Sequence, residues 1–260
     1  MSLIQTQQTD HVFTITLNAP QTFNAMTEAM ALEFHKTISA IKNDTSVRAV
    51  ILTGSGNAFS SGGHVDMLKG IGAKPQSEAA EDLKNFYNNY LILRELPQPV
   101  IAAINGAAVG AGFCLALACD LRLASTTAKM GANFAKIGIA PGMAATYLLQ
   151  NSVGKLKASE LLFTGKLVTA TEALQMGLVN AIYPSEDLAV AANKWAIEIA
   201  ANAPLALRYI KESLQLAETG QLQDIFAFDS LAQAQTLRTQ DFAEGIDAAI
   251  AKRVPVFIGK

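Results

Sequence analysis

The stretch from residue 105 to residue 120, NGAAVGAGFCLALACD, constrains the fold of this chain more than any other. An apolar run, Val100 to Ile104, precedes it and predicts a buried strand. Glycines at 106, 110 and 112 then let the backbone turn sharply and approach another group closely. A helical pattern starts at about Ala111. The stretch therefore predicts a tight turn that ends in a helix N-terminus, whose free N–H groups can bind an anion or a developing oxyanion.

Several known sites use such a turn, and most of them do not fit this sequence. A dinucleotide fingerprint needs a glycine or alanine three residues after Gly112 and an acid about twenty residues further on. Leu115 and Asp120 do not meet those conditions. A P-loop requires a closing Gly-Lys-Ser/Thr, and a nucleophile elbow requires Gly-x-Ser-x-Gly; the sequence contains neither. The remaining interpretation is an oxyanion hole.

A second turn of the same kind lies upstream, at residues 58–67, AFSSGGHVDM. It leads from an expected strand, Ala49 to Thr53, through Gly62 and Gly63 into a short helix. Two such turns can direct two backbone N–H groups at one oxygen atom. The sequence thus predicts that one donor comes from each turn.

With these two motifs the chain resembles the crotonase superfamily, also called the enoyl-CoA hydratase/isomerase family. The family pattern is Phe-x-x-Gly-Ala/Gly-Asp followed by Asn-Gly-x-x-x-Gly-Gly-Gly. The resemblance covers nearly the whole chain, and the order and spacing of the segments make it specific. The other shared segments are Asn24-Ala25-Met26, Pro97-x-Pro99-Val100-Ile101-Ala102, Gly138-Ile139-Ala140-Pro141-Gly142, Leu161-x-x-Thr164-Gly165, Ala170-x-x-Ala173-x-x-x-Gly177-Leu178-Val179, Glu244-Gly245 and Lys252-Arg253.

The resemblance implies an α/β fold, a spiral of β-β-α units followed by helices that pack the protein into trimers or pairs of trimers. We expect a core with the acyl-CoA site over residues 1–200 and a helical trimerisation region over residues 201–260. The implied ligand is an acyl-CoA thioester, and the implied chemistry uses no metal and no cofactor beyond the coenzyme A of the substrate. It would be a lyase or isomerase reaction of the kind found in fatty acid metabolism.

The resemblance also assigns roles to individual residues. The backbone N–H groups of Gly63 and Ala111 would hold the thioester oxygen and stabilise an enolate, and losing one such donor typically costs about 10²–10³ in rate. Backbone groups of Ala25, Ser61 and Gly63 would contact coenzyme A. Lys252 matches a lysine that in relatives reaches a phosphate of coenzyme A. His64, where the family usually has aspartate, can titrate near neutral pH, cap its helix or contact coenzyme A.

Hydratases of the family use two glutamates as acid and base, and both positions differ here. The resemblance places Cys114 at the first position and Phe134 at the second. Losing a positioned acid or base commonly costs about 10²–10⁴ in rate, so we expect poor hydration of a simple enoyl thioester. Cys114 can replace a glutamate only if its pKa falls; otherwise it is a small buried apolar residue. Tyr147 is a second possible donor, with core packing as its alternative role.

Three neighbouring polar residues have less specific expectations. Asn133 and Lys136 flank Phe134 and are expected to point away from the site. Asp120 is expected to be structural and to pair with backbone or with Arg122. The reaction itself stays open between enolate chemistry that needs little acid–base help, such as decarboxylation of a malonyl-type thioester, and a non-catalytic acyl-CoA-binding role.

The composition limits the location and partners of the protein. Half of the residues are hydrophobic, 16% are charged and the net charge is −2, so nucleic acid and anionic membrane are not expected partners. Cys114 and Cys119 are poorly placed to bridge each other, and the sequence has no signal peptide or apolar run of about 18 residues. We therefore expect a reduced, cytoplasmic protein.

Periodicity predicts most of the remaining elements. Strands are expected at 12–17, 48–53, 100–104, 120–124 and 179–182. Helices are expected at 27–43 and 78–95, and again at 186–201, 204–217, 221–237 and 240–252. The intervening segment 70–77, with two glycines and a proline, is expected to be a mobile loop.

Overall fold

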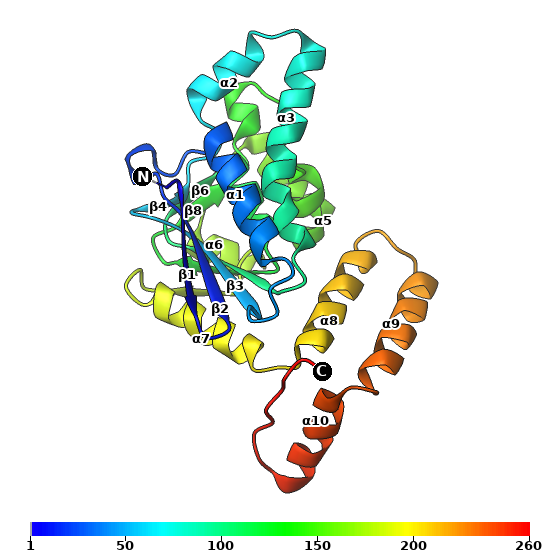
Figure 1. Cartoon of the computed structure of the whole chain (residues 1–260). Helices are drawn as coiled ribbons and strands as arrows, with labels where there is room; N and C mark the ends of the chain where they lie inside the picture. The colour runs from blue at the N-terminus through cyan, green and yellow to red at the C-terminus, as the bar shows by residue number, and fades with distance from the viewer. Residues whose placement is uncertain (1) are drawn as a thin grey trace.

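The computed structural model describes residues 2–260 and contains two β-sheets with helices packed around them (Figure 1). The six-stranded sheet has the order β1 (Ile4–Thr9), β2 (Val12–Leu17), β3 (Ala49–Gly54), β5 (Val100–Ile104), β7 (Leu121–Ser125) and β10 (Ala181–Tyr183). The four-stranded sheet has the order β4 (Ala58–Ser60), β6 (Ala107–Val109), β8 (Lys129–Gly131) and β9 (Val168–Thr169). Only β1 with β2 and β8 with β9 pair antiparallel; the other neighbours are parallel.

Successive pairs of strands alternate between the two sheets. The pairs β3–β4, β5–β6 and β7–β8 each give their first strand to the large sheet and their second to the small one. A helical segment follows each pair, so the chain winds as a spiral of β-β-α units. The predicted α/β fold class is therefore confirmed.

The helices are α1 (Glu28–Ile41), α2 (Val65–Gly72), α3 (Gln76–Leu91), α4 (Ala111–Leu117), α5 (Ala145–Thr164), α6 (Ala170–Gln175), α7 (Leu188–Ala200), α8 (Pro204–Ala217), α9 (Leu222–Thr236) and α10 (Gln240–Ala251), with short 3-10 helices η1 (Pro20–Thr22), η2 (Ile92–Glu95) and η3 (Phe134–Ile137).

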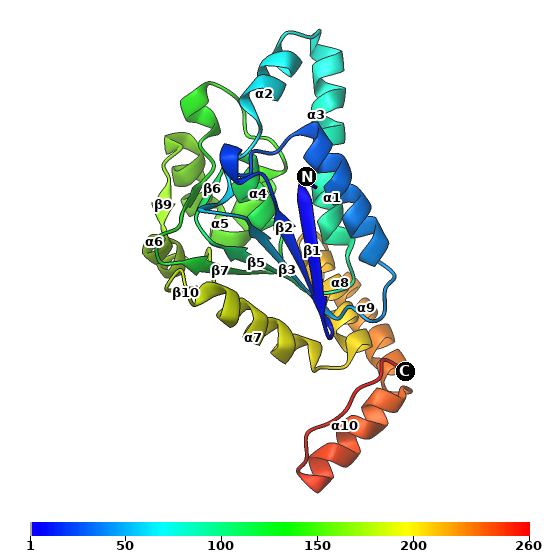
Figure 2. The same ribbon diagram turned by 60° about the vertical axis from the view of Figure 1, so that its left-hand side comes forward.

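Helices cover both faces of the large sheet (Figure 2). On one face, α1 buries the apolar stripe that its sequence predicts, and the ring of Phe34 lies 5.3 Å from that of Tyr90 in α3. The Thr27 side chain caps α1 by accepting a hydrogen bond from the Met30 N–H at 3.1 Å. On the other face, α7 packs against side chains such as Ile51 that alternate with those facing α1.

The last three helices extend away from the sheets (Figures 1 and 2). Their bounds agree closely with the predicted ranges, because each helix begins near a proline or a polar capping residue. A buried lysine, Lys211, holds α8 to the core: its Nζ donates to the Gln98 carbonyl at 2.9 Å and to Asp120 Oδ2 at 2.8 Å. Asp120 also accepts from the Val100 N–H at 2.7 Å. Asp120 is thus structural, as predicted, but its charged partner is Lys211 rather than Arg122.

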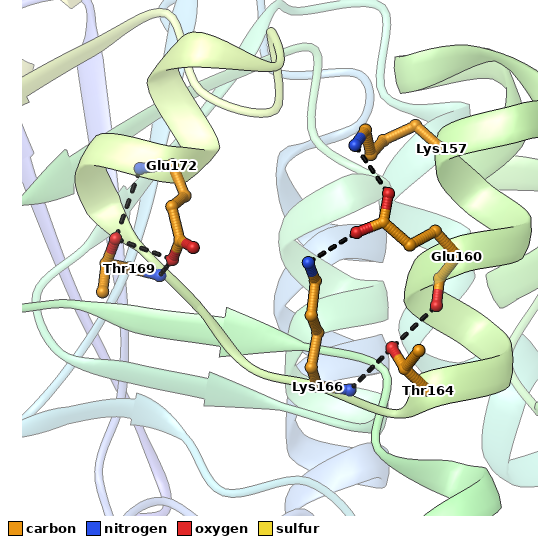
Figure 3. Close-up of polar contacts among 6 residues, drawn as sticks. All are labelled: Lys157, Glu160, Thr164, Lys166, Thr169 and Glu172. Carbon is orange, nitrogen blue, oxygen red and sulfur yellow. Dashed lines mark hydrogen bonds and ion pairs between the residues drawn. The ribbon is translucent and has the colours of Figure 1, made fainter.

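Polar contacts fix the connection between α5 and α6 (Figure 3). Glu160 accepts from Lys157 Nζ at 2.6 Å and from Lys166 Nζ at 2.5 Å, and these two hydrogen bonds lower the pKa of Glu160 to about 2. Thr169 and Glu172 form a capping box at the start of α6. Helix α5 ends at Thr164, and Gly165 follows it in the left-handed region at φ 56°.

Two parts of the chain differ from the expectation. Segment 70–77 is largely helical: α2 runs to Gly72, α3 starts at Gln76, and a Cβ at Gly70 or Gly72 would meet nothing within 4 Å. The glycines there are not needed for a turn. Strand β1 was not predicted because its residues IQTQQT are polar and only Ile4 is buried, as in an edge strand paired along one side.

The cysteine and helix predictions can also be compared with the structure. Cys114 and Cys119 are both buried free thiols, so the prediction that they do not bridge is confirmed. Across residues 2–260, no helix combines the length and the apolar character that crossing a membrane requires.

Candidate active site

The two glycine-rich turns lie directly against each other. Gly62 has φ +94°, and a Cβ built on it would lie 2.7 Å from the Val109 carbonyl oxygen and 3.3 Å from the Ala111 nitrogen. A Cβ on Gly112 would lie 2.6 Å from both the Cβ and the carbonyl oxygen of Ser60. Side chains at Gly62 and Gly112 would separate the turns, so glycine is required at both positions for this close approach.

The predicted oxyanion donors come from these touching turns. Gly62 accepts from the Met26 N–H at 2.7 Å and the His64 N–H donates to Met26 at 2.9 Å, which leaves the intervening Gly63 N–H unused. Ala111 is the first residue of α4, where an N–H has no partner inside the helix. Among residues 2–260, neither of these two N–H groups donates a hydrogen bond. Both predicted donors are therefore unpaired, and they lie on two turns that contact each other at Gly62 and Ala111.

Two asparagines hold the first turn in place beneath the second. Asn24 Nδ2 donates to the Ala58 carbonyl at 2.8 Å and to the Ser55 carbonyl at 2.9 Å. Asn105 Nδ2 donates to the same Ala58 carbonyl at 3.2 Å and to Gly56 at 2.9 Å. These are the asparagines of the two shared motifs, Asn-Ala-Met and Asn-Gly. Their role in this structure is to join three loops rather than to face a ligand.

The two positions that the resemblance assigns to glutamates are apolar in this fold. Cys114 is fully buried on α4, one helical turn after Ala111, and its Sγ lies 3.8 Å from the Gly142 carbonyl oxygen. Burial raises the pKa of Cys114 to about 12, so the thiol stays protonated near neutral pH. Phe134 is buried at the start of η3, and its ring lies 3.9 Å from the place where a Cβ of Gly110 would be.

Two polar residues at this site were missed or misplaced by sequence reasoning. The hydroxyl of Tyr87 contacts Gly142 beside Cys114, and burial raises the pKa of Tyr87. The sequence predicted only that Tyr87 lies in the helix expected at 78–95. Asn133 was expected to point away, but its Oδ1 lies 3.4 Å from the Cβ position of Gly110. Lys136 does point elsewhere, toward Gly165.

The remaining candidates lie at varying distances from the turns. His64 caps α2, with its Nδ1 accepting from the Asp66 N–H at 3.3 Å. The Ser61 and Ala25 N–H groups bond to Phe23 and Thr22, so both residues belong to the first turn and the loop before it. Tyr147 is neither in the core nor at the site: its hydroxyl donates to Glu218 at 2.7 Å on the surface.

Lys252 is separated from the other site residues. Lys252 follows α10 in the left-handed region, with φ 53°. In space, α10 and α2 lie at opposite ends of the molecule (Figure 1). Within one chain, Lys252 therefore does not join the site, and its contact with coenzyme A stays a prediction that requires a second copy of the protein. Among residues 2–260, no three His, Cys, Asp or Glu side chains gather as metal ligands would.

Comparison with known proteins agrees with this geometry. The pattern of the family described as enoyl-CoA hydratase/isomerase matches residues 7–260. The chain belongs to the enoyl-CoA hydratase/isomerase family. YngF of Bacillus subtilis (strain 168), which is provisionally named an enoyl-CoA hydratase/isomerase, is 38% identical over 259 residues, covering 99% of this chain and 98% of YngF.

Two further members show the breadth of the family around this chain. The 1,2-epoxyphenylacetyl-CoA isomerase of Escherichia coli (strain K12) is 32% identical over 96% of this chain and 95% of its own length. The crystal structure of an enoyl-CoA hydratase from Bacillus anthracis superposes with a TM-score of 0.94 at 32% identity and covers 100% of both chains. Membership in the enoyl-CoA hydratase/isomerase family thus fixes the fold and leaves more than one reaction open.

We predict that alanine destabilises the protein at Gly62 but has little effect at Gly63. Gly62→Ala places a Cβ against Val109 and Ala111 at a positive φ, so it should lower the free energy of unfolding by at least about 1 kcal/mol. Gly63→Ala is the matched control, because its Cβ would lie 3.5 Å from carbons of Leu68, an ordinary contact. We expect that control to stay within about 0.5 kcal/mol of the wild type in urea unfolding. Equal losses in both variants would contradict the packing of the two turns.

Proposed function

We propose that this protein binds an acyl-CoA thioester and stabilises the enolate form of its acyl group. The observation that carries the proposal is the pair of unpaired N–H groups, on Gly63 and Ala111, at the contact between the two turns. When a thioester becomes an enolate, negative charge develops on its oxygen atom. Two donors already fixed in position stabilise that charge without reorganisation, which is why such pairs contribute strongly to catalysis. Backbone atoms of Ala25, Ser61 and Gly63 bind coenzyme A in this proposal.

The side chains around the acyl group favour a reaction that needs no strong base. Cys114 holds its proton, and Phe134 offers neither acid nor base. Hydration requires water to lose one proton and the α-carbon to gain another, so these two residues support it poorly. Loss of carbon dioxide from a malonyl-type thioester is a better fit, because the breaking bond itself supplies the electron pair of the enolate. If the protein is a catalyst, His64 is the remaining candidate for proton transfer. The alternative is a non-catalytic role in which the protein only binds acyl-CoA.

We also propose that the protein works in the cytoplasm as a homotrimer or as a pair of trimers. Among the described residues, large apolar side chains are exposed along α8 and α9. The most exposed are Ile210, Leu214, Leu222, Phe226 and Leu231, with 56%, 66%, 77%, 72% and 75% of their surface accessible. Contiguous apolar surface of this kind is typical of assembly interfaces. In such an assembly, a neighbouring copy can bring Lys252 to the coenzyme A site.

We predict that acyl-CoA thioesters stabilise the folded protein, whereas NAD and ATP do not. A ligand that binds only the native state adds about 2.7 kcal/mol to the free energy of unfolding at a hundredfold excess over Kd. Melting temperatures measured with each compound at millimolar concentration test this. A melting temperature that rises with NAD and does not move with acyl-CoA thioesters would refute the proposed ligand.

We predict a molar mass of three or six chains in solution, measured by light scattering at micromolar concentration. Replacing exposed apolar residues of α9, for example Phe226→Glu, should shift the mass toward one chain, because a charge cannot be buried unpaired at an interface. A matched change on an exposed polar position of the same helix, Gln235→Glu, should leave the mass unchanged. A single-chain mass for the wild type would count against the assembly.

We predict that the wild-type protein hydrates crotonyl-CoA far more slowly than a relative with two glutamates. Each missing acid or base commonly costs about 10²–10⁴ in rate. The double variant Cys114→Glu/Phe134→Glu should hydrate faster than the wild type, and each single variant should gain much less. Burial raises the pKa of the two introduced carboxyls and so reduces the gain in hydration rate of the double variant. The hydration rate of the wild type is therefore the decisive measurement. Efficient hydration by the wild type would contradict the proposal and make His64→Ala the next variant.

A further inference from the structure

The hydroxyl of Tyr87 lies where Cys114 and Gly142 meet. A Cβ added to Gly142 would overlap the Tyr87 hydroxyl and lie 2.9 Å from Cζ, so the phenol tip rests directly on the Gly142 backbone. Cys114 Sγ lies 3.8 Å from the carbonyl oxygen of the same residue. A residue of α3 and a residue of α4 therefore share one small region of the site.

This region is close to the predicted oxyanion hole. Cys114 follows Ala111 by three residues on α4, so the two lie on the same face of the helix with a rise of about 4.5 Å between them. Carbon–carbon bonds are about 1.5 Å long. If a thioester oxygen accepts from the Ala111 N–H, the first carbons of its acyl group span a comparable distance. An acyl group held at Ala111 would therefore reach the region where Cys114, Gly142 and the Tyr87 hydroxyl meet.

Tyr87 has the properties of a hydrogen-bond donor that awaits a partner. Its ring packs edge-on against Phe86, with the ring centroids 6.1 Å apart, which fixes its direction. Within residues 2–260 its hydroxyl has no hydrogen-bond partner, although the side chain is half-buried. Its oxygen is not among the buried, unpartnered side-chain atoms of the described residues, so the hydroxyl is open to solvent and to a bound ligand. A phenol keeps its proton near neutral pH, and burial raises the pKa of Tyr87 further, so the hydroxyl can donate. The neighbouring Cys114 thiol is protonated and offers no competing charge.

We propose that Tyr87 is the specificity-determining residue for the acyl group, and that its hydroxyl donates to an oxygen on the β-carbon. The protein then prefers thioesters whose acyl group carries oxygen at that carbon over plain alkanoyl thioesters. This inference rests on the proposed function, since it needs an acyl group held at Gly63 and Ala111. The role differs from that of the two glutamate positions, because Tyr87 comes from a different helix and transfers no proton.

The test compares two ligands that differ by one oxygen atom, butyryl-CoA and 3-hydroxybutyryl-CoA, by titration calorimetry. The proteins are the wild type, Tyr87→Phe and the control Tyr147→Phe, which removes a tyrosine hydroxyl that bonds to Glu218 on the surface. A hydrogen bond contributes about three- to tenfold in affinity. We expect Tyr87→Phe to lose that factor for 3-hydroxybutyryl-CoA and to bind butyryl-CoA as the wild type does. Tyr147→Phe should bind both ligands unchanged.

A second variant tests the position of the hydroxyl without removing it. Gly142→Ala displaces the phenol tip, so it should also lower the affinity for 3-hydroxybutyryl-CoA more than the affinity for butyryl-CoA. If the wild type binds both thioesters and Tyr87→Phe weakens them equally or not at all, the role of Tyr87 is overturned and the proposed function stands. If the wild type binds neither thioester, the proposed function fails and the role of Tyr87 fails with it.

Discussion

The backbone carbonyl of Ala58 is the point on which the site depends, because two asparagine side chains from distant loops donate to it. Asn24 reaches it at 2.8 Å and Asn105 at 3.2 Å. Asn24 is completely buried, so an unpaired amide there would cost about 1–3 kcal/mol. The pairing fixes the loop before β4 against the loop before β6. Since Gly63 follows β4 and Ala111 follows β6, the same hydrogen bonds set the relative position of the two N–H donors.

Close backbone packing then keeps the donors in place without any side chain between them. Gly62 and Gly112 bring the two turns together, and Gly106 does the same one step earlier, where an added Cβ would strike the Asn57 carbonyl. A site made of backbone atoms in this way has little freedom to move, which suits electrostatic stabilisation of a developing charge. Backbone N–H groups also do not depend on the neighbouring side chains, so residues at positions such as Cys114 and Phe134 can differ while the two donors stay the same.

Local patterns in the sequence predicted much of this architecture. The turns at 62–63 and 110–112, strand β5 and helix α8 were all expected, because glycine chemistry, apolar runs and capping residues act over a few residues. Contacts between distant residues were not predicted. Lys211 pairs with Asp120 across 91 positions, and Tyr87 meets Gly142 across 55 positions. Helical periodicity places Tyr87 in a helix but does not show which distant residue its hydroxyl meets, so the hydroxyl could not be assigned to the site.

The balance of donors and acceptors at the proposed acyl site limits its chemistry. Gly63, Ala111 and Tyr87 all supply protons for hydrogen bonds, whereas Cys114 keeps its proton and Phe134 has none to exchange. Donors stabilise negative charge once it has formed, but they do not remove a proton from carbon or from water. If the proposed function holds, the electron pair of the enolate must come from the substrate itself, through a bond that breaks within it. The substrate, rather than a glutamate pair, then determines whether this member of the enoyl-CoA hydratase/isomerase family turns over or only binds.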